Sequence, residues 1–401
     1  MKQYIQLLQE EKVLRRLSLI QLISYFGAWF SNVAIYTLLL HLHVDAQVVA
    51  FVASLHFLAG VVQAPFSGTL IDRIKPKKLM LSLLVVEMLT TLLLLQVDTL
   101  DDLKLLYALI FFKMAAASFY FTTEMSLLPK ILSGEKLQRA NELHSIIWSF
   151  SYTLGMAISG FVVYSVGVYV AFVIDASMFF IASILLVTLV LEVEFTPHKE
   201  HFFKMMQQTF GYLRATPQAF HLMVLHAFVG LTAFDALVAL MVENYYASFI
   251  ATSLALGLLH ASRAVGLVIG PVFLGKLINN KNFVYLFIAQ GFAIWLWAYL
   301  MDSFYLSLLA SVCVGLFTTT LWSYSYTLLQ KNIDKHYYGR IVAYNDMLFL
   351  STSALTSFMI GFLAKNGFSL EMITLVLGSG FFIGALYYKW IINKENIKEI
   401  G

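Results

Sequence analysis

The sequence predicts an all-α integral membrane protein with twelve transmembrane helices in two six-helix halves. Composition predicts the class. Hydrophobic residues make up 60% of the 401 residues and charged residues only 12%, against roughly 25% charged residues in soluble domains. The mean hydropathy is +0.79. So little polar surface excludes a soluble enzyme, a nucleic-acid-binding protein and a disordered chain.

Apolar stretches predict the number of helices. A helix needs about 20 mostly apolar residues to cross a bilayer, and stretches of about this length recur twelve times. They cover residues 17–40, 48–70, 79–97, 103–125, 140–164, 168–191, 217–242, 250–275, 282–300, 304–328, 340–364 and 370–391. The first stretch has basic residues before it and no small-residue cleavage site after it, so we expect a retained span rather than a signal peptide.

The longest loop divides these spans six and six. We therefore expect an N-terminal half at residues 1–191, a cytoplasmic central loop at 192–216 and a C-terminal half at 217–401. The basic and apolar residues of this loop predict a short amphipathic helix around residues 200–213. No loop is long enough for a soluble domain.

Lys and Arg residues predict the orientation, because they concentrate in cytoplasmic loops. With a cytoplasmic N-terminus, 22 of the 26 Lys and Arg residues fall in cytoplasmic segments and two, Lys104 and Lys365, in external loops. The remaining two, Lys113 and Arg263, lie inside spans. We expect a multi-pass protein of a bacterial-type inner (plasma) membrane with both termini cytoplasmic.

A short repeat suggests that the two halves are related. Gly68-Thr-Leu-Ile-Asp72 ends the second span, and Gly275-Lys-Leu-Ile-Asn279 ends the second span of the second half. Such a pattern also arises by chance in a Leu-rich chain, but its equivalent position favours duplication. Two repeated halves are typical of transporters that bind substrate between them.

The loop after the second span carries a dense charge pattern. Gly68 permits close helix approach at the span end. Asp72 can accept hydrogen bonds or pair with an arginine, and Arg73, Lys77 and Lys78 hold the loop at the cytoplasmic face. A charge cluster of this kind can latch one conformation of a moving bundle, so we expect a cytoplasmic gate here. A plain positive-inside loop is the alternative.

This loop resembles the signature between the second and third helices of the major facilitator superfamily, with Lys75 in place of the usual glycine. In span five, Gly155, Ser159 and Gly160 resemble the antiporter motif Gly-Pro-x-x-Gly-Gly, with Met156 in place of the proline. These three residues are expected to serve helix packing. The resemblance implies two halves that rock about a central cavity in alternating access.

Other segments resemble the drug and siderophore efflux branch of that superfamily, which includes macrolide-efflux and enterobactin-exporter proteins. They are Leu128-Pro129, Arg139-Ala140-Asn141, Asp175-Ala-Ser-Met-Phe179 and Gly339-Arg340. This resemblance implies export.

Charged residues inside spans are functional candidates because burying a charge in a membrane is costly. Lys113 looks like a replacement for the span-four arginine that is proposed to take part in proton transfer in the superfamily. A lysine can lose its proton when desolvated, whereas an arginine effectively cannot. The alternative is a structural ion pair with Glu87. Glu87 and Lys113 are therefore candidates for proton coupling.

Four more ionisable residues lie in the later spans. Asp235 and Arg263 fall in adjacent spans and are expected either to pair or to face the cavity, Asp235 for proton coupling and Arg263 for an anionic group of the substrate. His260 is a secondary proton site, since histidine titrates near neutral pH. Asp346 lies near the cytoplasmic end of its span and, with Arg340, is assigned to the gate. Asp175 is expected to be structural.

Span one has no acidic residue but a polar and aromatic face. Gln21, Tyr25, Trp29, Asn32 and Tyr36 recur at helical spacing and share one side of the helix. The last four are expected to contact a bulky, partly apolar organic substrate. Packing and lipid-interface aromatics are the alternative.

Other chemistry finds little support. The ten histidines include no His-x-x-x-His pair with a carboxylate on the same face, so we expect no metal site. No phosphate-binding loop is present, and no cofactor is expected. Transport must therefore use an ion gradient or the gradient of the substrate.

The sequence thus predicts a secondary active transporter, not an enzyme, that exports a small amphipathic, drug- or siderophore-like molecule by proton antiport. Its expected partners are this substrate, protons and the lipid bilayer, with no nucleic acid, and it is expected to be a monomer. The alternatives are an importer or uniporter of a nutrient such as an organic acid, a divalent-metal exporter, and a non-transporting membrane sensor.

Overall fold

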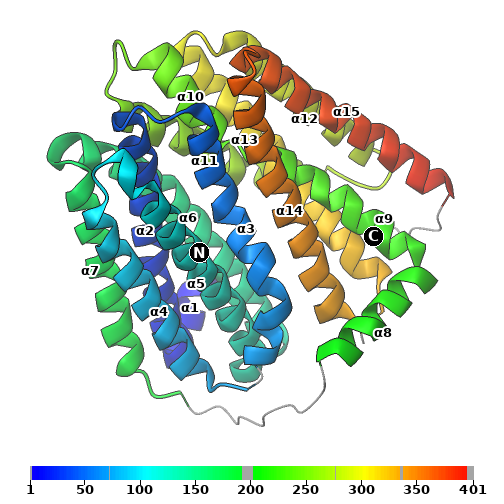
Figure 1. Cartoon of the computed structure of the whole chain (residues 1–401). Coiled ribbons are helices and arrows are strands. Elements are labelled where there is room, and N and C mark those ends of the chain that lie inside the picture. Colours follow the sequence, from blue (N-terminus) through cyan, green and yellow to red (C-terminus); the bar gives the residue numbers. More distant parts are fainter. Residues whose placement is uncertain (1, 72, 192–201, 276, 335–336, 395–401) are drawn as a thin grey trace. The chain divides into compact units, whose positions relative to one another are not determined.

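A computed structural model describes residues 2–71, 73–191, 202–275, 277–334 and 337–394. Within these ranges, the side chains of residues 2, 65–69, 138, 202–206, 338 and 339 lie outside the description. All regular elements of the described ranges are helical, as Figure 1 shows.

The prediction of twelve spans is confirmed, since twelve helical segments are long and apolar enough to cross a membrane. Eleven of them are α-helices with at most a short 3₁₀ extension, and the seventh, Pro217–Tyr246, is built from several short pieces. The eleven helices are α2 (Lys12–His41), α3 (Ala46–Ile71), α4 (Pro76–Leu93), α5 (Leu103–Ile131), α6 (Gly134–Val166), α7 (Val168–Val187), α11 (Thr252–Leu274), α12 (Phe283–Leu300), α13 (Phe304–Asn332), α14 (Tyr338–Lys365) and α15 (Leu370–Lys394).

The chain forms two compact units. Unit 1 comprises Met1–Val44, Val62–Lys199 and Ala251–Ala261, and unit 2 comprises Asp45–Val61, Glu200–Ile250 and Ser262–Gly401. They follow the expected halves 1–191 and 217–401 except in two helices. The first part of α3 belongs to unit 2, and the first part of α11 belongs to unit 1.

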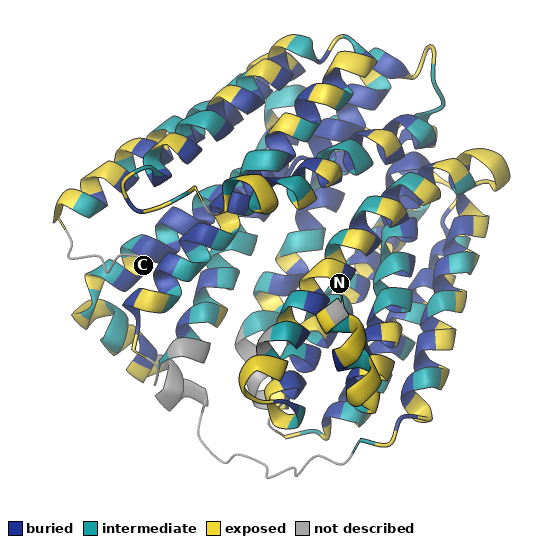
Figure 2. Cartoon of the chain, turned by 180° about the vertical axis from the view of Figure 1, so that it is seen from behind, coloured by how far each residue is buried: buried dark blue, intermediate teal, exposed yellow. Residues whose placement is uncertain are grey.

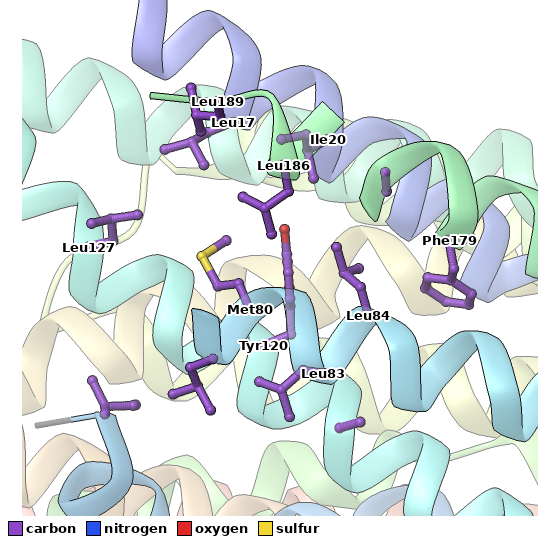
Figure 3. Packing of buried hydrophobic residues seen from close by; sticks show 14 residues of the cluster. Leu17, Ile20, Met80, Leu83, Leu84, Tyr120, Leu127, Phe179, Leu186 and Leu189 are labelled. Carbon is purple, nitrogen blue, oxygen red and sulfur yellow. The ribbon is translucent and has the colours of Figure 1, made fainter. Parts of the chain in front are cut away.

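The core of unit 1 lies between α2, α4, α5 and α7. α2 packs against α6 and α7, and α4 packs against α5 and α7. Figure 3 shows part of the core, where Met80 and Leu84 of α4 lie near the Tyr120 ring of α5, with Leu186 of α7 beside them. Large side chains that interlock in this way fix the helices relative to one another, because a packed interior leaves few voids.

The core of unit 2 is richer in aromatic residues. α12 packs against α13 and α15. Phe287 of α12 is fully buried and contacts the rings of Phe283 and Phe381, and the indole of Trp297 donates a hydrogen bond to Ser307 (2.8 Å). The buried Trp therefore satisfies its polar group inside the bundle, as such residues usually do.

Exposed residues, coloured yellow in Figure 2, occur along the spans, and many of them are large and apolar. On α11, α12 and α15 they include Val272, Phe273, Tyr299 and Leu386, each more than two thirds exposed. In water such surfaces would be unfavourable, whereas lipid tails are as apolar as these side chains. The outer faces of the spans therefore fit a bilayer.

Two shorter helices accompany the spans. α8 (Phe202–Ala215) lies where the loop sequence predicts an amphipathic helix at residues 200–213. The other, α1 (Lys2–Glu10), precedes the first span and was not predicted. Leu7 of α1 is buried in a small cluster with Leu128 and Leu132, at the end of α5, and Ala140 of α6. α1 is therefore part of unit 1.

Candidate transport site

Two buried charges of unit 1 form an ion pair. The Nζ atom of Lys113 on α5 lies 2.9 Å from Oδ2 of Asp175 on α7, and the two side chains are 4% and 0% exposed. Lys113 also donates to the Thr91 hydroxyl on α4 (2.7 Å), and the Ser31 hydroxyl on α2 donates to the same Asp175 oxygen. The ammonium group lies over the Phe179 ring (4.5 Å to its centroid). Four helices thus meet at one charge pair.

The observed pair differs from the ion pair of Lys113 with Glu87 that the sequence suggested as an alternative. The partner of Lys113 is Asp175 and not Glu87. Glu87 is also buried, and it lies within electrostatic range of both Lys113 and Asp175 and of the hydroxyl groups of Tyr25 and Tyr120. Sequence spacing could not identify the partner, because α4, α5 and α7 are far apart along the chain.

A further buried acid escaped the sequence analysis. Glu124 of α5 is 2% exposed, and its Oε2 lies 3.5 Å from the Tyr25 hydroxyl of α2. The predicted span ended at residue 125, which made this acid look like a boundary residue, whereas α5 continues to Ile131. Helical spacing would have revealed it, since Lys113, Tyr120 and Glu124 follow one another at seven and four residues on the same helix face.

A histidine of α6 completes this polar region. Gln21 Nε2 of α2 lies 2.7 Å from Nδ1 of His144 and 3.3 Å from the His144 carbonyl oxygen. Because a carbonyl only accepts, the Gln21 nitrogen must be the donor, which makes Nδ1 an acceptor and places the proton of the neutral ring on Nε2. The rings of Tyr25 and Phe121 contact this imidazole edge-on.

The remaining residues of the span-one face lie inside unit 1. The Trp29 ring contacts Trp148 (5.9 Å) and Tyr152 (4.6 Å) of α6. Asn32 and Tyr36 are buried. Among the described residues, the Trp29 indole nitrogen and Asn32 Oδ1 have no hydrogen-bond partner. The role of Tyr25, Trp29, Asn32 and Tyr36 in substrate binding stays a prediction.

The span-five motif residues lie at close helix contacts. A Cβ on Gly155 would lie 2.8 Å from Cβ of Trp29, and one on Gly160 would lie 2.6 Å from the carbonyl oxygen of Ser253 on α11. Such distances leave no room for a larger residue. The Ser159 hydroxyl donates to the Phe30 carbonyl (2.9 Å).

The basic loop after α3 is only partly described. Asp72 lies outside the described residues, as does the immediate surrounding of Gly68, whose backbone belongs to α3. Arg73 and Lys78 are exposed. Lys77 donates to the Val187 and Leu189 carbonyls at the end of α7 (2.9 and 2.7 Å), where a helix leaves carbonyls unpaired and favours a cation. Arg16 of α2 likewise donates to the Thr188 carbonyl (2.8 Å).

The two other predicted gate residues lie on α14 in unit 2. Arg340 Nη1 lies 3.2 Å from Gln208 Oε1 of α8. Asp346 is half-buried and contacts the amide of its neighbour Asn345 (3.4 Å). The Arg340 contact connects α8 to the start of α14 within unit 2, whereas the Asp346 contact lies within α14.

The seventh span is interrupted, which the sequence did not predict. α9 (Pro217–Ala227) is followed by a 3₁₀ turn (η3, Phe228–Thr232), by α10 (Asp235–Met241) and by a π-helical turn (η4, Val242–Tyr246). Gly230 allows this segment to approach α14, since a Cβ there would lie 2.9 Å from the Phe349 carbonyl.

Arg263 lies at this interruption. Its Nη2 donates to the Thr232 carbonyl (2.9 Å), and its guanidinium lies 5.1 Å from the centre of the Phe234 ring. Asp235 is half-buried at the first position of α10, and His260 is buried on α11. Arg263 thus bonds a carbonyl at the break of the helix, which also accepts from the Phe234 backbone N–H (2.9 Å), and within the described residues the Nε atom of Arg263 has no partner.

Metal-binding residues do not gather within the described ranges. There, no group of three or more His, Cys, Asp or Glu side chains is placed to hold a metal ion.

Twelve apolar spans with charged and polar side chains buried between them define a multi-pass membrane protein. Residues 17–243 match the Major Facilitator Superfamily, and the chain belongs to this family. Among curated proteins, none matches the chain in sequence.

Solved structures support the same fold. A mutant form of the nucleoside transporter NupG is similar with a TM-score of 0.75 and 13% sequence identity, over 94% of this chain and 99% of the other. A second structure of the nucleoside transporter NupG is similar with a TM-score of 0.71 and 12% identity, over 96% of this chain and 100% of the other. At such identities the similarity establishes the fold alone.

Proposed function

We propose that this transporter exports a small amphipathic organic molecule, drug- or siderophore-like, from the cytoplasm in exchange for protons. It would act as a monomer in the inner membrane with both termini cytoplasmic. The buried pair of Lys113 and Asp175 is the observation that carries proton coupling. The efflux-type segments around Pro129, Arg139 and Asp175 support export.

The ion pair suits coupling because protons decide whether it exists. Two charges removed from water are stable only while each neutralises the other. Among the described residues, the second carboxylate oxygen of Asp175, Oδ1, has no hydrogen-bond partner, so the pair depends on Lys113. A proton that reaches the Asp175 carboxylate removes that balance and leaves the Lys113 ammonium without its counter-charge. Since the pair joins α2, α4, α5 and α7, protonation changes the forces between four helices of unit 1. Glu87 lies within electrostatic range of both charges, and we assign it as the residue that exchanges the proton with this pair.

The other predicted residues take the roles that the sequence suggested. Asp235 and His260 would assist proton transfer, while Arg263 and the span-one residues Tyr25, Trp29, Asn32 and Tyr36 would contact the substrate. The loop from Gly68 to Lys78, with Arg340 and Asp346, would form the cytoplasmic gate.

Everted membrane vesicles test this proposal. Their interior is acidified, a pH-sensitive dye reports the gradient, and drugs, siderophores, organic acids, nucleosides and divalent metal ions are added one at a time. We expect the gradient to collapse with amphipathic organic compounds and to persist when both charges are removed in Lys113→Met/Asp175→Asn.

The control is the Lys365→Met variant, which removes an exposed lysine that bonds Gln47. It should behave like the wild type. A flat response from folded wild-type protein would contradict proton coupling. Uptake of a compound into intact cells, with no export, would favour an importer or uniporter, and a response to metal ions alone would favour a metal exporter.

A further inference from the structure

A buried histidine of unit 2 lies among three aromatic rings. His226 occupies the last turn of α9, directly before the interruption of the seventh span, and its side chain is fully buried. Its ring centre lies 5.6 Å from that of Trp322 and 5.4 Å from that of Tyr326, both on α13, and 5.7 Å from that of Phe349 on α14. We call these four residues the His226 cluster.

The contacts around this histidine allow the position of its proton to be assigned. Nδ1 lies 2.8 Å from the Ser325 hydroxyl oxygen. That hydroxyl also lies 2.8 Å from the Leu321 carbonyl and 3.1 Å from the Trp322 carbonyl, which only accept. Ser325 has a single proton, and we assign it to the Leu321 carbonyl, so that Ser325 accepts from His226. The neutral imidazole therefore carries its proton on Nδ1 and has a lone pair on Nε2.

This lone pair has no partner inside the protein. Among the residues that the structure describes, nothing forms a hydrogen bond with Nε2 of His226. A buried polar atom without a partner is rare and costs free energy, so it calls for an explanation such as a bound molecule.

The neighbouring rings offer a flat apolar surface. Trp322 and Tyr326 are one helical turn apart, and their rings stack at 5.0 Å with an angle of 17° between their planes. Trp322 is 38% exposed, and Tyr326 and Phe349 are half-buried. Flat, partly open aromatic faces bind planar rings by stacking, with little dependence on the pattern of substituents.

We propose that the His226 cluster binds a planar heteroaromatic group that carries an N–H or O–H donor. The ring of the ligand stacks on the partly exposed Trp322 ring, whose other face is covered by Tyr326, and its donor forms a hydrogen bond with His226 Nε2. This proposal rests on the transport function proposed above and specifies the class of its substrate. A site built around an unpaired acceptor discriminates strongly against an analogue that lacks the donor, because binding the analogue leaves the acceptor unpaired.

Unit 1 contains a sequence that resembles part of this cluster. Trp148-Ser-Phe-Ser-Tyr152 on α6 and Trp322-Ser-Tyr-Ser-Tyr326 on α13 differ at one position, and both contain a stacked Trp–Tyr pair. The histidine distinguishes the cluster of unit 2, because Trp29 occupies the neighbouring position in unit 1 and an indole nitrogen only donates.

Ligand binding to the purified full-length protein in lipid nanodiscs tests the proposal. The probes are indole, which has a ring N–H donor, and 1-methylindole, which has the same flat ring without the donor. Saturation-transfer NMR gives the Kd of each. We expect the wild type to bind indole about tenfold or more tightly than 1-methylindole, which corresponds to the loss of one hydrogen bond of about 1.4 kcal/mol.

Four variants separate the contributions of the cluster. His226→Phe should abolish the preference for indole, and His226→Gln, which keeps an acceptor near the position of Nε2, should restore part of it. Trp322→Leu should weaken both probes at least threefold. His221→Phe is the matched control, because His221 lies on the same helix but contacts Tyr387 and Trp390 instead. It should bind both probes like the wild type.

Equal binding of both probes by the wild type would overturn the proposal, as would a preference for indole that survives in folded His226→Phe protein. If His226→Phe does not fold, the test rests on the wild-type comparison and on His226→Gln. The assay uses no proton gradient, so its outcome is independent of coupling. A wild-type protein that binds both probes equally but still exchanges protons would refute this inference alone. A wild-type protein that prefers indole but shows no proton antiport would refute proton coupling alone.

Discussion

Lys113 and Asp175 neutralise each other where neither side chain is accessible to solvent. Such a pair gains little net stability, because the cost of removing two charges from water is about as large as their attraction. The Thr91 and Ser31 hydroxyls reduce this cost by bonding the charged atoms. The same arrangement makes the loss of a single partner expensive. The pair is therefore better explained by function than by stability.

A double-mutant comparison tests this account of the pair. Lys113→Met alone leaves the Asp175 carboxylate buried without a counter-charge and should cost about 3–5 kcal/mol. Adding Asp175→Asn removes the stranded charge, so the double variant should regain most of this loss. The melting temperature of the purified protein in detergent measures both. A double variant no more stable than the single one would contradict the account.

Arg263 has two competing roles that a second variant separates. In the structure it bonds the Thr232 carbonyl and lies over Phe234, so Arg263→Met should loosen the interrupted segment and cost about 1–3 kcal/mol. Hydrogen exchange at residues 228–234 should then become faster. Lys365→Met is the control, since that lysine bonds Gln47 elsewhere in unit 2. Native exchange rates combined with lost binding of anionic compounds would indicate a role in substrate binding alone.

At the scale of the element, α1 shows how a short helix is held in place by packing. α1 is too short to be stable alone, and it is held by Leu7 in a cluster with the ends of α5 and α6. A hydrogen bond from the Tyr4 hydroxyl to Glu142 (2.9 Å) and the exposed pairs of Lys136 with Glu10 and Glu11 add to this contact. Exposed pairs contribute little, so the leucine carries most of the attachment.

Two substitutions in α1 test this view. Leu7→Asp places a charge in the buried cluster and should release the helix, because burying a leucine is worth about 1.5–3 kcal/mol. Ile5→Asp should have little effect, since Ile5 is exposed. Hydrogen exchange over residues 2–10 distinguishes the two. Protection that persists in Leu7→Asp would show that other contacts hold α1.

At the scale of the whole molecule, the chain is two compact units, and α3 and α11 each contribute residues to both. α3 approaches α14 within unit 2, where the Ser54 hydroxyl donates to the Ala354 carbonyl (2.9 Å). α11 approaches α6 within unit 1 at Gly160 and Gly257. The two compact units therefore do not coincide with the two halves on either side of the central loop, because α3 and α11 each belong partly to both units.

The orientation in the membrane is a property of the whole chain and can be tested directly. In a Cys313→Ser background, which has no other cysteine, Lys104→Cys and Lys78→Cys place single thiols at exposed positions of opposite predicted sides. A membrane-impermeant maleimide added to intact cells should label the first and not the second. The reverse pattern would place both termini outside.

The sequence accounted well for the spans. Their number and approximate bounds depend on the local concentration of apolar residues, which a bilayer requires of every spanning helix. The sequence did not predict the interruption between α9 and α10. This interruption depends on the close approach of Gly230 to the Phe349 carbonyl of α14 and on the hydrogen bond from Arg263 to Thr232. Neither partner is near this segment in the chain.

By itself, the sequence determined that this protein crosses the membrane twelve times, because hydropathy and length are local properties. It also marked Lys113, Asp175 and Glu87 as unusual, since a charge in an apolar span is conspicuous in any context. Only the tertiary structure decided which of them pair, and it alone gathered His226, Trp322, Tyr326 and Phe349. Pairing and stacking require groups within a few ångströms, and the packing of distant helices sets those distances.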